Sequence, residues 1–213
     1  EKLELQLAGL VENDYLISYG GIKEVDKDLN LIRELPPKWE TGFQLKSQLL
    51  YFEINLVTSM VNRHKLMQLG LNFDPEMQAS EEYNLYMRLL PHGSVYVCQD
   101  IIALYRVYSD SLTYSKIDRL AEERRITLNE LALSIPSLKD ETEFKIAQRQ
   151  SDYYEACFHM NRKDFAVARR LMWRHASSPV FTALFAISFF PAVWKFCHDP
   201  TVKKKLTGIM RLH

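Results

Sequence analysis

The sequence predicts a mixed α/β part followed by an all-helical, basic part, and three observations support this division. Apolar β-leaning runs and helical patterns alternate as far as about residue 114, whereas only helical patterns follow. The composition is 47% hydrophobic and 25% charged, which is ordinary for a globular protein. Charge is unevenly distributed, because residues 161–213 hold ten Lys or Arg against two Asp or Glu although the whole chain has zero formal charge. We therefore expect domains at 1–114 and 115–213.

Local patterns predict each element of the first part in turn. Leucines spaced among charged residues from Leu3 to Leu10 predict an amphipathic helix that ends near Gly9. A β-leaning run at 15–19 is broken by Gly20-Gly21, resumes at 22–25, and is joined to a return strand at 31–32 by a polar turn. The remaining predictions are a helix at 43–52, an extended segment at 54–62, a helix at 64–69 capped by Gly70, a helix at 81–90, and strands at 94–98 and 101–108.

In the second part, a helix capped by Ser115 or Asp118 is expected to run to about Ala132. Further helices are predicted at 141–160 and 164–176, followed by a long apolar segment at 180–196 and a lysine-rich end. The three cysteines are far apart and have neither metal nor disulfide spacing, which favours a reducing, cytosolic setting. With seven glycines the chain has no Gly-rich phosphate loop, and its histidines have no metal-ligand spacing.

The residues most suggestive of chemistry are two adjacent carboxylates, Glu81 and Glu82, at the predicted start of a helix that follows a loop. The positive end of the helix dipole is expected to keep both side chains ionised. A carboxylate held in this way beside a cleft can act as a general base. The alternative is that acidic residues in the first turn only stabilise the helix, which is their commoner role.

Five segments resemble parts of family 2 glycosyltransferases in the same order, and together they cover roughly residues 1–135. The segment Phe73-Asp74-Pro75-Glu76, followed by Glu81-Glu82-Tyr83-Asn84-Leu85-Tyr86-Met87-Arg88-Leu89, is similar to the loop and Glu-Asp helix of that family. The segment from Ile101 to Thr113, which contains Tyr105-Arg106-Val107-Tyr108, resembles its Leu-x-x-Tyr-Arg-x-His-x-x-Ser-x-Ser segment. Residues 15–30 and 49–63 resemble its strand-turn-strand and its acceptor-side segment, and residues 1–6 resemble the helix after its metal motif.

The resemblance implies the C-terminal part of a GT-A fold and inverting sugar transfer from a nucleotide-diphospho-sugar to a glycan or lipid-linked acceptor. Glu82 then falls on the catalytic general base. Four substrate-binding residues are implied, namely Glu81, Asn55, Arg106 and Tyr108, and Arg106 would contact the diphosphate. The complete enzyme is expected to use a divalent cation, Mg²⁺ or Mn²⁺, bound upstream of Glu1. The literal Asp26-Lys27-Asp28 is instead expected to form a solvated turn.

The sequence departs from the family pattern at three positions. Glu82 stands where Asp is usual, Asn84 replaces a second Asp, and Tyr108 replaces a frequent His. The loss of this His removes a contact to the diphosphate or metal. For Arg106 an equally plausible role is an ion pair with Glu81 at the end of a strand.

The second part contains nineteen uncharged residues, Ala176 to Trp194, with cationic residues on both sides. We expect the segment 176–205 to associate with a membrane, because aromatic residues with flanking lysines suit anionic headgroups. A buried helix is the second interpretation and a true span the third, since Pro179 and Pro191 interrupt the apolar run. A nucleic-acid partner is not expected, because the lysines border an apolar helix.

The function predicted from these features is glycosyl transfer on the cytoplasmic side, peripheral to the inner face of the membrane. The chain would supply the general base and the acceptor side of the site. The alternative prediction is a non-catalytic, membrane-associated interaction module built on a truncated or degenerate transferase scaffold.

Overall fold

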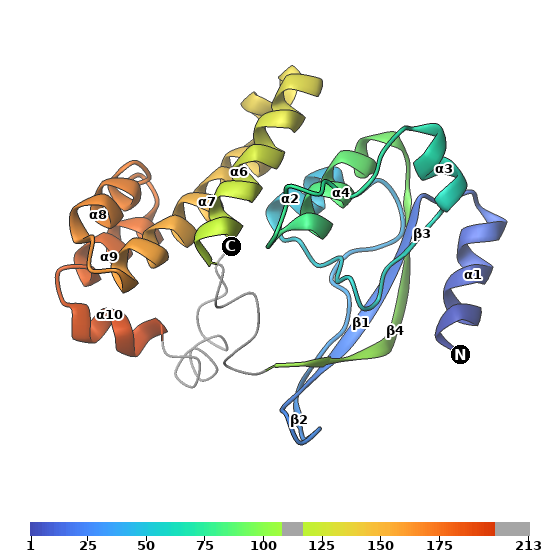
Figure 1. Cartoon of the computed structure of the whole chain (residues 1–213), viewed down its shortest axis with the longest axis horizontal. Helices are drawn as coiled ribbons and strands as arrows, with labels where there is room; N and C mark the ends of the chain where they lie inside the picture. Colours follow the sequence, from blue (N-terminus) through green and yellow to red (C-terminus); the bar gives the residue numbers. More distant parts are fainter. Residues whose placement is uncertain (108–116, 199–213) are drawn as a thin grey trace. The chain divides into compact units, whose positions relative to one another are not determined.

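The computed structural model describes residues 1–107 and 117–198, and the chain divides into two compact units, Glu1–Ala147 and Gln148–His213. The first unit contains a four-stranded open sheet whose central strand is β1, Ile17–Val25. The strands β2, Leu31–Leu35, and β3, Met60–Val61, pair antiparallel with the two ends of β1, and β4, Val95–Arg106, pairs with β1 in parallel (Figure 1). This mixed sheet with its helices confirms the predicted α/β class.

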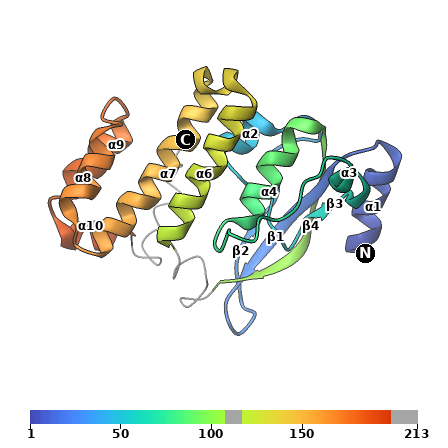
Figure 2. The ribbon, with the colours of Figure 1, turned by 45° about the horizontal axis from the view of Figure 1, so that its top comes forward.

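Successive side chains on the strands pack against helices on the two opposite faces of the sheet. On one face, α1, Lys2–Glu12, contacts β1 and β4, and the buried Gln6 Nε2 donates to Ser18 Oγ at 3.1 Å (Figure 2). On the other face, Ile17 and Tyr19 join a core to which α4, Glu81–Leu89, contributes five buried side chains. Because successive strand residues point to opposite faces, β1 is buried on both sides.

The close approach of α1 to the sheet depends on Gly9. A Cβ at this position would lie 2.3 Å from the Tyr96 ring, which stacks on Tyr15. We therefore expect Gly9→Ala to destabilise the fold by about 1–3 kcal/mol through overpacking, measured by urea unfolding. The double variant Gly9→Ala/Tyr96→Leu should recover part of this loss, and an additive loss instead would contradict the steric explanation.

Gly20-Gly21 does not break the strand, contrary to the prediction, and the two strands expected at 94–98 and 101–108 form the single strand β4. The β1–β4 register shifts here, because Gly20 pairs with Cys98 and Gly21 with Ile101. A Cβ on Gly20 would lie 2.8 Å from Ile102 Cδ1, and one on Gly21 would lie 2.9 Å from the Leu35 carbonyl oxygen. The glycines therefore allow close packing of neighbouring strands instead of forming a turn.

The helices of the first unit lie near their predicted positions, with some shorter and some longer than expected. α1 continues past Gly9 to Glu12, and Gly70 follows α3 with φ +64, as a left-handed helix end requires. The other elements of this unit are α2, Leu45–Leu50, α3, Arg63–Gln68, a 3₁₀ turn at Leu90–His92, α6, Ile117–Ser134, and a 3₁₀ turn at Pro136–Asp140.

The two compact units meet later in the chain than the predicted boundary near Tyr114, a residue that lies outside the described part. The reason is that α6 packs on α4, and Leu128, Leu131 and Ala132 are buried in the same core as the sheet. The first helix after residue 114 is therefore an integral layer of the α/β unit.

The second unit begins within α7, Thr142–Asn161, and continues with α8, Phe165–Trp173. The apolar segment expected as one stretch forms two short helices, α9, Pro179–Ile187, and α10, Pro191–His198. Pro191 begins a new helix because its ring fixes φ and it has no N–H to continue the previous one. In residues 1–107 and 117–198, no helix has both the length and the apolar character needed to cross a membrane.

Candidate functional site

A hollow of about 600 Å³ opens in the first unit beside β1 and the end of β4. Its walls come from the segment after β2, from residues 51–57, and from the loop that leads into α4. Four of the five residues predicted for the site line it, namely Glu81, Glu82, Asn55 and Arg106. Tyr108 lies outside the described residues. Segments far apart in the sequence therefore bring two carboxylates, an amide and a guanidinium to one concave surface.

Glu82 is half-buried at the start of α4, and burial raises the pKa of its carboxyl above the ordinary Glu value. Its own backbone N–H and Arg124 act against this rise in pKa, whereas the charges of Glu81 and Glu123 add to it. The helix N-terminus was expected to dominate, but the loss of water contact has the larger effect. Because its pKa is raised, the Glu82 carboxylate is a stronger base than that of an ordinary glutamate.

The loop before Glu81 is held by a buried carboxylate that the sequence analysis did not identify. Glu123 on α6 is 3% exposed and accepts hydrogen bonds from the backbone N–H groups of Gln78 at 2.8 Å, Ala79 at 2.9 Å and Ser80 at 2.8 Å. This carboxylate fixes the entry to α4 and hence the direction in which Glu81 and Glu82 leave the backbone. The only signal in the sequence was its spacing of four from Thr127, which is also buried.

Asn84, where the family pattern has Asp, contacts α6 instead of the hollow. Its side-chain nitrogen donates to Thr127 Oγ1 at 3.1 Å and to Glu130 Oε2 at 3.2 Å. A carboxylate has no hydrogen to donate and would repel Glu130, so the amide suits this helix contact. Packing between α4 and α6 therefore accounts for an amide at this position.

The opposite wall is fixed by a network around Tyr19. Its hydroxyl donates to Glu53 Oε1 at 2.6 Å and lies 3.1 Å from Gln44 Oε1, while Gln48 Nε2 donates to the hydroxyl at 3.3 Å. Glu53 Oε2 also accepts from the Lys38 backbone N–H at 2.9 Å. Burial and the neighbouring Glu53 raise the pKa of Tyr19, so the phenol stays protonated and acts as a donor.

Asn55 lies on the same side of the hollow as this network. Its side-chain oxygen accepts from the Val57 N–H at 3.0 Å, which closes a local turn. Within the described residues its amide nitrogen has no acceptor, so this group can donate to a ligand hydroxyl.

The cationic groups of the hollow differ in their partners. Arg33 forms a two-point pair with Glu24, with N–O distances of 2.6 and 3.0 Å. Arg106 is exposed at the end of β4, and in the part of the chain that the structure describes it forms no ion pair with Glu81. The ion-pair alternative for Arg106 is therefore not observed, and its guanidinium faces a space that an anion could enter.

The described residues do not form a site suited to the expected divalent cation. Among residues 1–107 and 117–198 there is no group of three His, Cys, Asp or Glu side chains placed to hold a metal ion. Asp26 is used in a turn, as predicted: its Oδ1 accepts from the N–H groups of Asp28 and Asn30, both at 2.9 Å. The Asn30 side-chain amide, which donates to Asp26 Oδ2 at 3.0 Å, lowers the pKa of Asp26 most, and the backbone hydrogen bonds lower it further.

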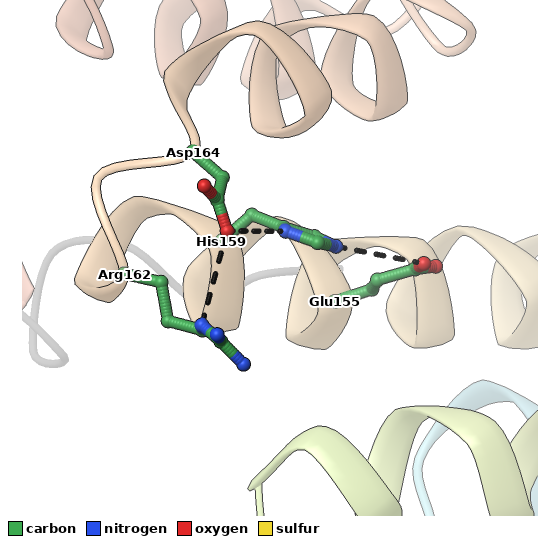
Figure 3. Close-up of polar contacts among 4 residues, drawn as sticks. All are labelled: Glu155, His159, Arg162 and Asp164. Carbon is green, nitrogen blue, oxygen red and sulfur yellow. Dashed lines mark hydrogen bonds and ion pairs between the residues drawn. The ribbon is translucent and has the colours of Figure 1, made fainter.

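A second polar cluster lies in the helical unit, at the turn between α7 and α8. Figure 3 shows the His159 ring between Asp164, whose Oδ2 is 3.5 Å from Nδ1, and Glu155, whose Oε1 is 3.9 Å from Nε2. Arg162 Nε lies 3.9 Å from the same Asp164 oxygen. This cluster brackets Lys163, which has φ +66, and is best explained as support for the turn.

Comparisons of the chain with protein-family models, with curated proteins and with solved structures found no match.

Proposed function

We propose that this chain carries the acceptor side of an inverting glycosyltransferase of the family 2 type, with a GT-A fold and Glu82 as general base. The observation that supports this proposal is that Glu81, Glu82, Asn55 and Arg106 line one hollow. These residues belong to three of the five segments that resemble the family. A hollow of about 600 Å³ is large enough for a small ligand such as a sugar unit.

The proposed chemistry is a single displacement. The acceptor hydroxyl oxygen forms a bond to the anomeric carbon of the donor while the bond from that carbon to the diphosphate oxygen breaks. The hydroxyl proton passes to Glu82, and the electron pair of the broken bond leaves with the nucleoside diphosphate. A carboxylate whose pKa is raised by burial takes this proton more readily than an ordinary glutamate.

The other residues would orient the reactants. The amide nitrogen of Asn55 can donate to an acceptor hydroxyl, and Glu81 can accept from a second hydroxyl of the acceptor. Arg106 can donate to the diphosphate, where negative charge develops as the bond breaks. No step is assigned to a metal ion, because the described residues do not provide its ligands.

The test is a screen of nucleotide-diphospho-sugars and glycan or lipid-linked acceptors with the complete protein. We expect transfer that inverts the anomeric configuration, detected by NMR of the product. Saccharide binding without transfer under all conditions would favour the non-catalytic interaction module. If the protein showed neither saccharide binding nor sugar transfer, both the proposed function and its alternative would be ruled out.

A further inference from the structure

Large apolar side chains lie on the outward face of α10 as well as on its inward face. Inward, Trp194 is 3% exposed and stacks on His198 with ring centroids 4.0 Å apart, and His198 Nε2 lies 2.9 Å from the Tyr153 hydroxyl. Outward, Val193 and Phe196 are 45% and 62% exposed. A helix at a protein surface normally places polar side chains on its outer side. This helix is therefore anchored on one face and leaves a second apolar face in contact with water.

The turn between α9 and α10 extends this exposed face. Phe189 and Phe190 are 51% and 64% exposed, and Trp173 at the end of α8 is 61% exposed. We call the exposed set of Trp173, Phe189, Phe190, Val193 and Phe196 the aromatic face. Such a grouping exceeds the single exposed apolar residues that are normal on a protein surface.

Contacts from α8 hold part of the aromatic face in place. The ring of Phe185 lies between Trp173 and Phe189, with centroid distances of 5.0 and 5.2 Å. Arg169 Nη2 donates to the Ser188 carbonyl oxygen at 3.0 Å, and its guanidinium lies 4.1 Å from the centroid of the Phe189 ring. The exposed rings therefore belong to an ordered surface.

The charged side chains on the segment 165–198, which carries the aromatic face, are all cationic. Residues 165–198 include Arg169, Arg170, Arg174 and Lys195 and no Asp or Glu. Arg170, Arg174 and Lys195 are exposed. Exposed aromatic side chains among cations complement a surface that offers both phosphate groups and hydrocarbon.

We infer that the aromatic face is a docking surface for an anionic lipid bilayer. The rings enter the boundary between headgroups and acyl chains, and the arginines and Lys195 contact lipid phosphates. Four of the five side chains of this surface lie within the segment 176–205 that the sequence predicts to associate with a membrane, and Trp173 lies just before that segment. It goes beyond the proposed transfer reaction, and its test does not depend on that reaction.

The experiment is sedimentation of the full chain with vesicles of equal parts phosphatidylcholine and phosphatidylglycerol, and with phosphatidylcholine alone. We expect clear binding to the anionic vesicles, weaker binding to the neutral ones, and a loss of roughly tenfold or more in partition for Phe190→Ser/Phe196→Ser. The matched control is Phe43→Ser, since Phe43 is 79% exposed in the first unit and should leave partition unchanged.

A second measurement does not depend on the folding of that double variant. Brominated anionic lipid should quench part of the tryptophan fluorescence of the unaltered chain, and Trp173→Phe should abolish most of this quenching. The proposal is overturned if the unaltered chain fails to bind anionic vesicles, or if quenching persists without Trp173. Self-association that the double variant abolishes, with no vesicle binding by the unaltered chain, would assign the face to a second copy instead.

Discussion

Replacing Glu82, the general base of the proposed reaction, with glutamine is expected to lower turnover about 100-fold or more, with little change in donor binding. Glutamine has nearly the same shape but cannot accept a proton in the displacement. The effect should therefore appear in kcat, measured with saturating donor and acceptor. A kinetic loss confined to KM would indicate that Glu82 only binds substrate.

The control for this variant is Glu76→Gln, the same substitution on an exposed residue in the loop before α4. Turnover of this variant should match that of the unaltered protein. Equal turnover in Glu82→Gln and Glu76→Gln would remove Glu82 from the mechanism. If both variants transferred sugar at the rate of the unaltered protein, another residue of the hollow would have to be the general base.

The Glu82→Gln variant should also have a larger free energy of unfolding than the unaltered protein at neutral pH. Burial raises the pKa of Glu82 in the folded chain, so the folded state binds this proton more tightly than the unfolded state. The stabilising contribution is fully present below the ordinary Glu pKa near 4.5 and is lost as pH rises through the folded pKa. Urea unfolding should show the stability gain of Glu82→Gln at about pH 7 and not at about pH 4. A stability difference between Glu82→Gln and the unaltered protein that is the same at both pH values would contradict the raised pKa of Glu82.

Replacing Glu123 with alanine is expected to destabilise the first unit by about 3 kcal/mol or more. The substitution removes the acceptor of three backbone N–H groups and leaves them in a buried loop. Hydrogen bonds to a charged group are among the stronger ones, and unsatisfied buried donors add to the cost. Chemical unfolding of the complete protein would measure the loss.

The neighbouring Glu122→Ala provides the control, because Glu122 is exposed on the same helix. Its effect should stay within the few tenths of a kcal/mol typical of surface positions. Glu123→Gln should fall between the two variants, since the amide keeps one acceptor oxygen but turns its NH₂ group toward an N–H donor. A Glu123→Ala protein as stable as Glu122→Ala would show that the loop does not depend on this carboxylate.

The features predicted correctly from the sequence are those that short-range physics decides. The Asp26 turn depends on side-chain hydrogen bonds to residues two and four positions away. The end of α3 depends on Gly70, a single residue in the left-handed conformation just after the helix. The start of α4 at Glu81 follows directly from the end of a polar loop. Each of these signals is complete within a few neighbouring residues.

The features that were missed depend on partners distant in sequence. Gly20-Gly21 has the local pattern of a turn, but its function is close contact with Ile102 and Leu35. The carboxylate of Glu123 finds its donors more than forty positions away, and no local pattern specifies that pairing. The sequence indicated that a helix terminus would keep Glu82 ionised. Burial, which raises the pKa of Glu82, depends on the folded chain and has no local pattern.

The hydrogen bonds from Gln78, Ala79 and Ser80 to Glu123 have a practical consequence for anyone who wishes to shorten or recombine this protein. A chain cut after residue 114 would keep every strand of the sheet and every described residue lining the hollow. It would nevertheless release the segment that aims the two glutamates. Any exchange that moves this sheet into another protein should therefore include α6 as well.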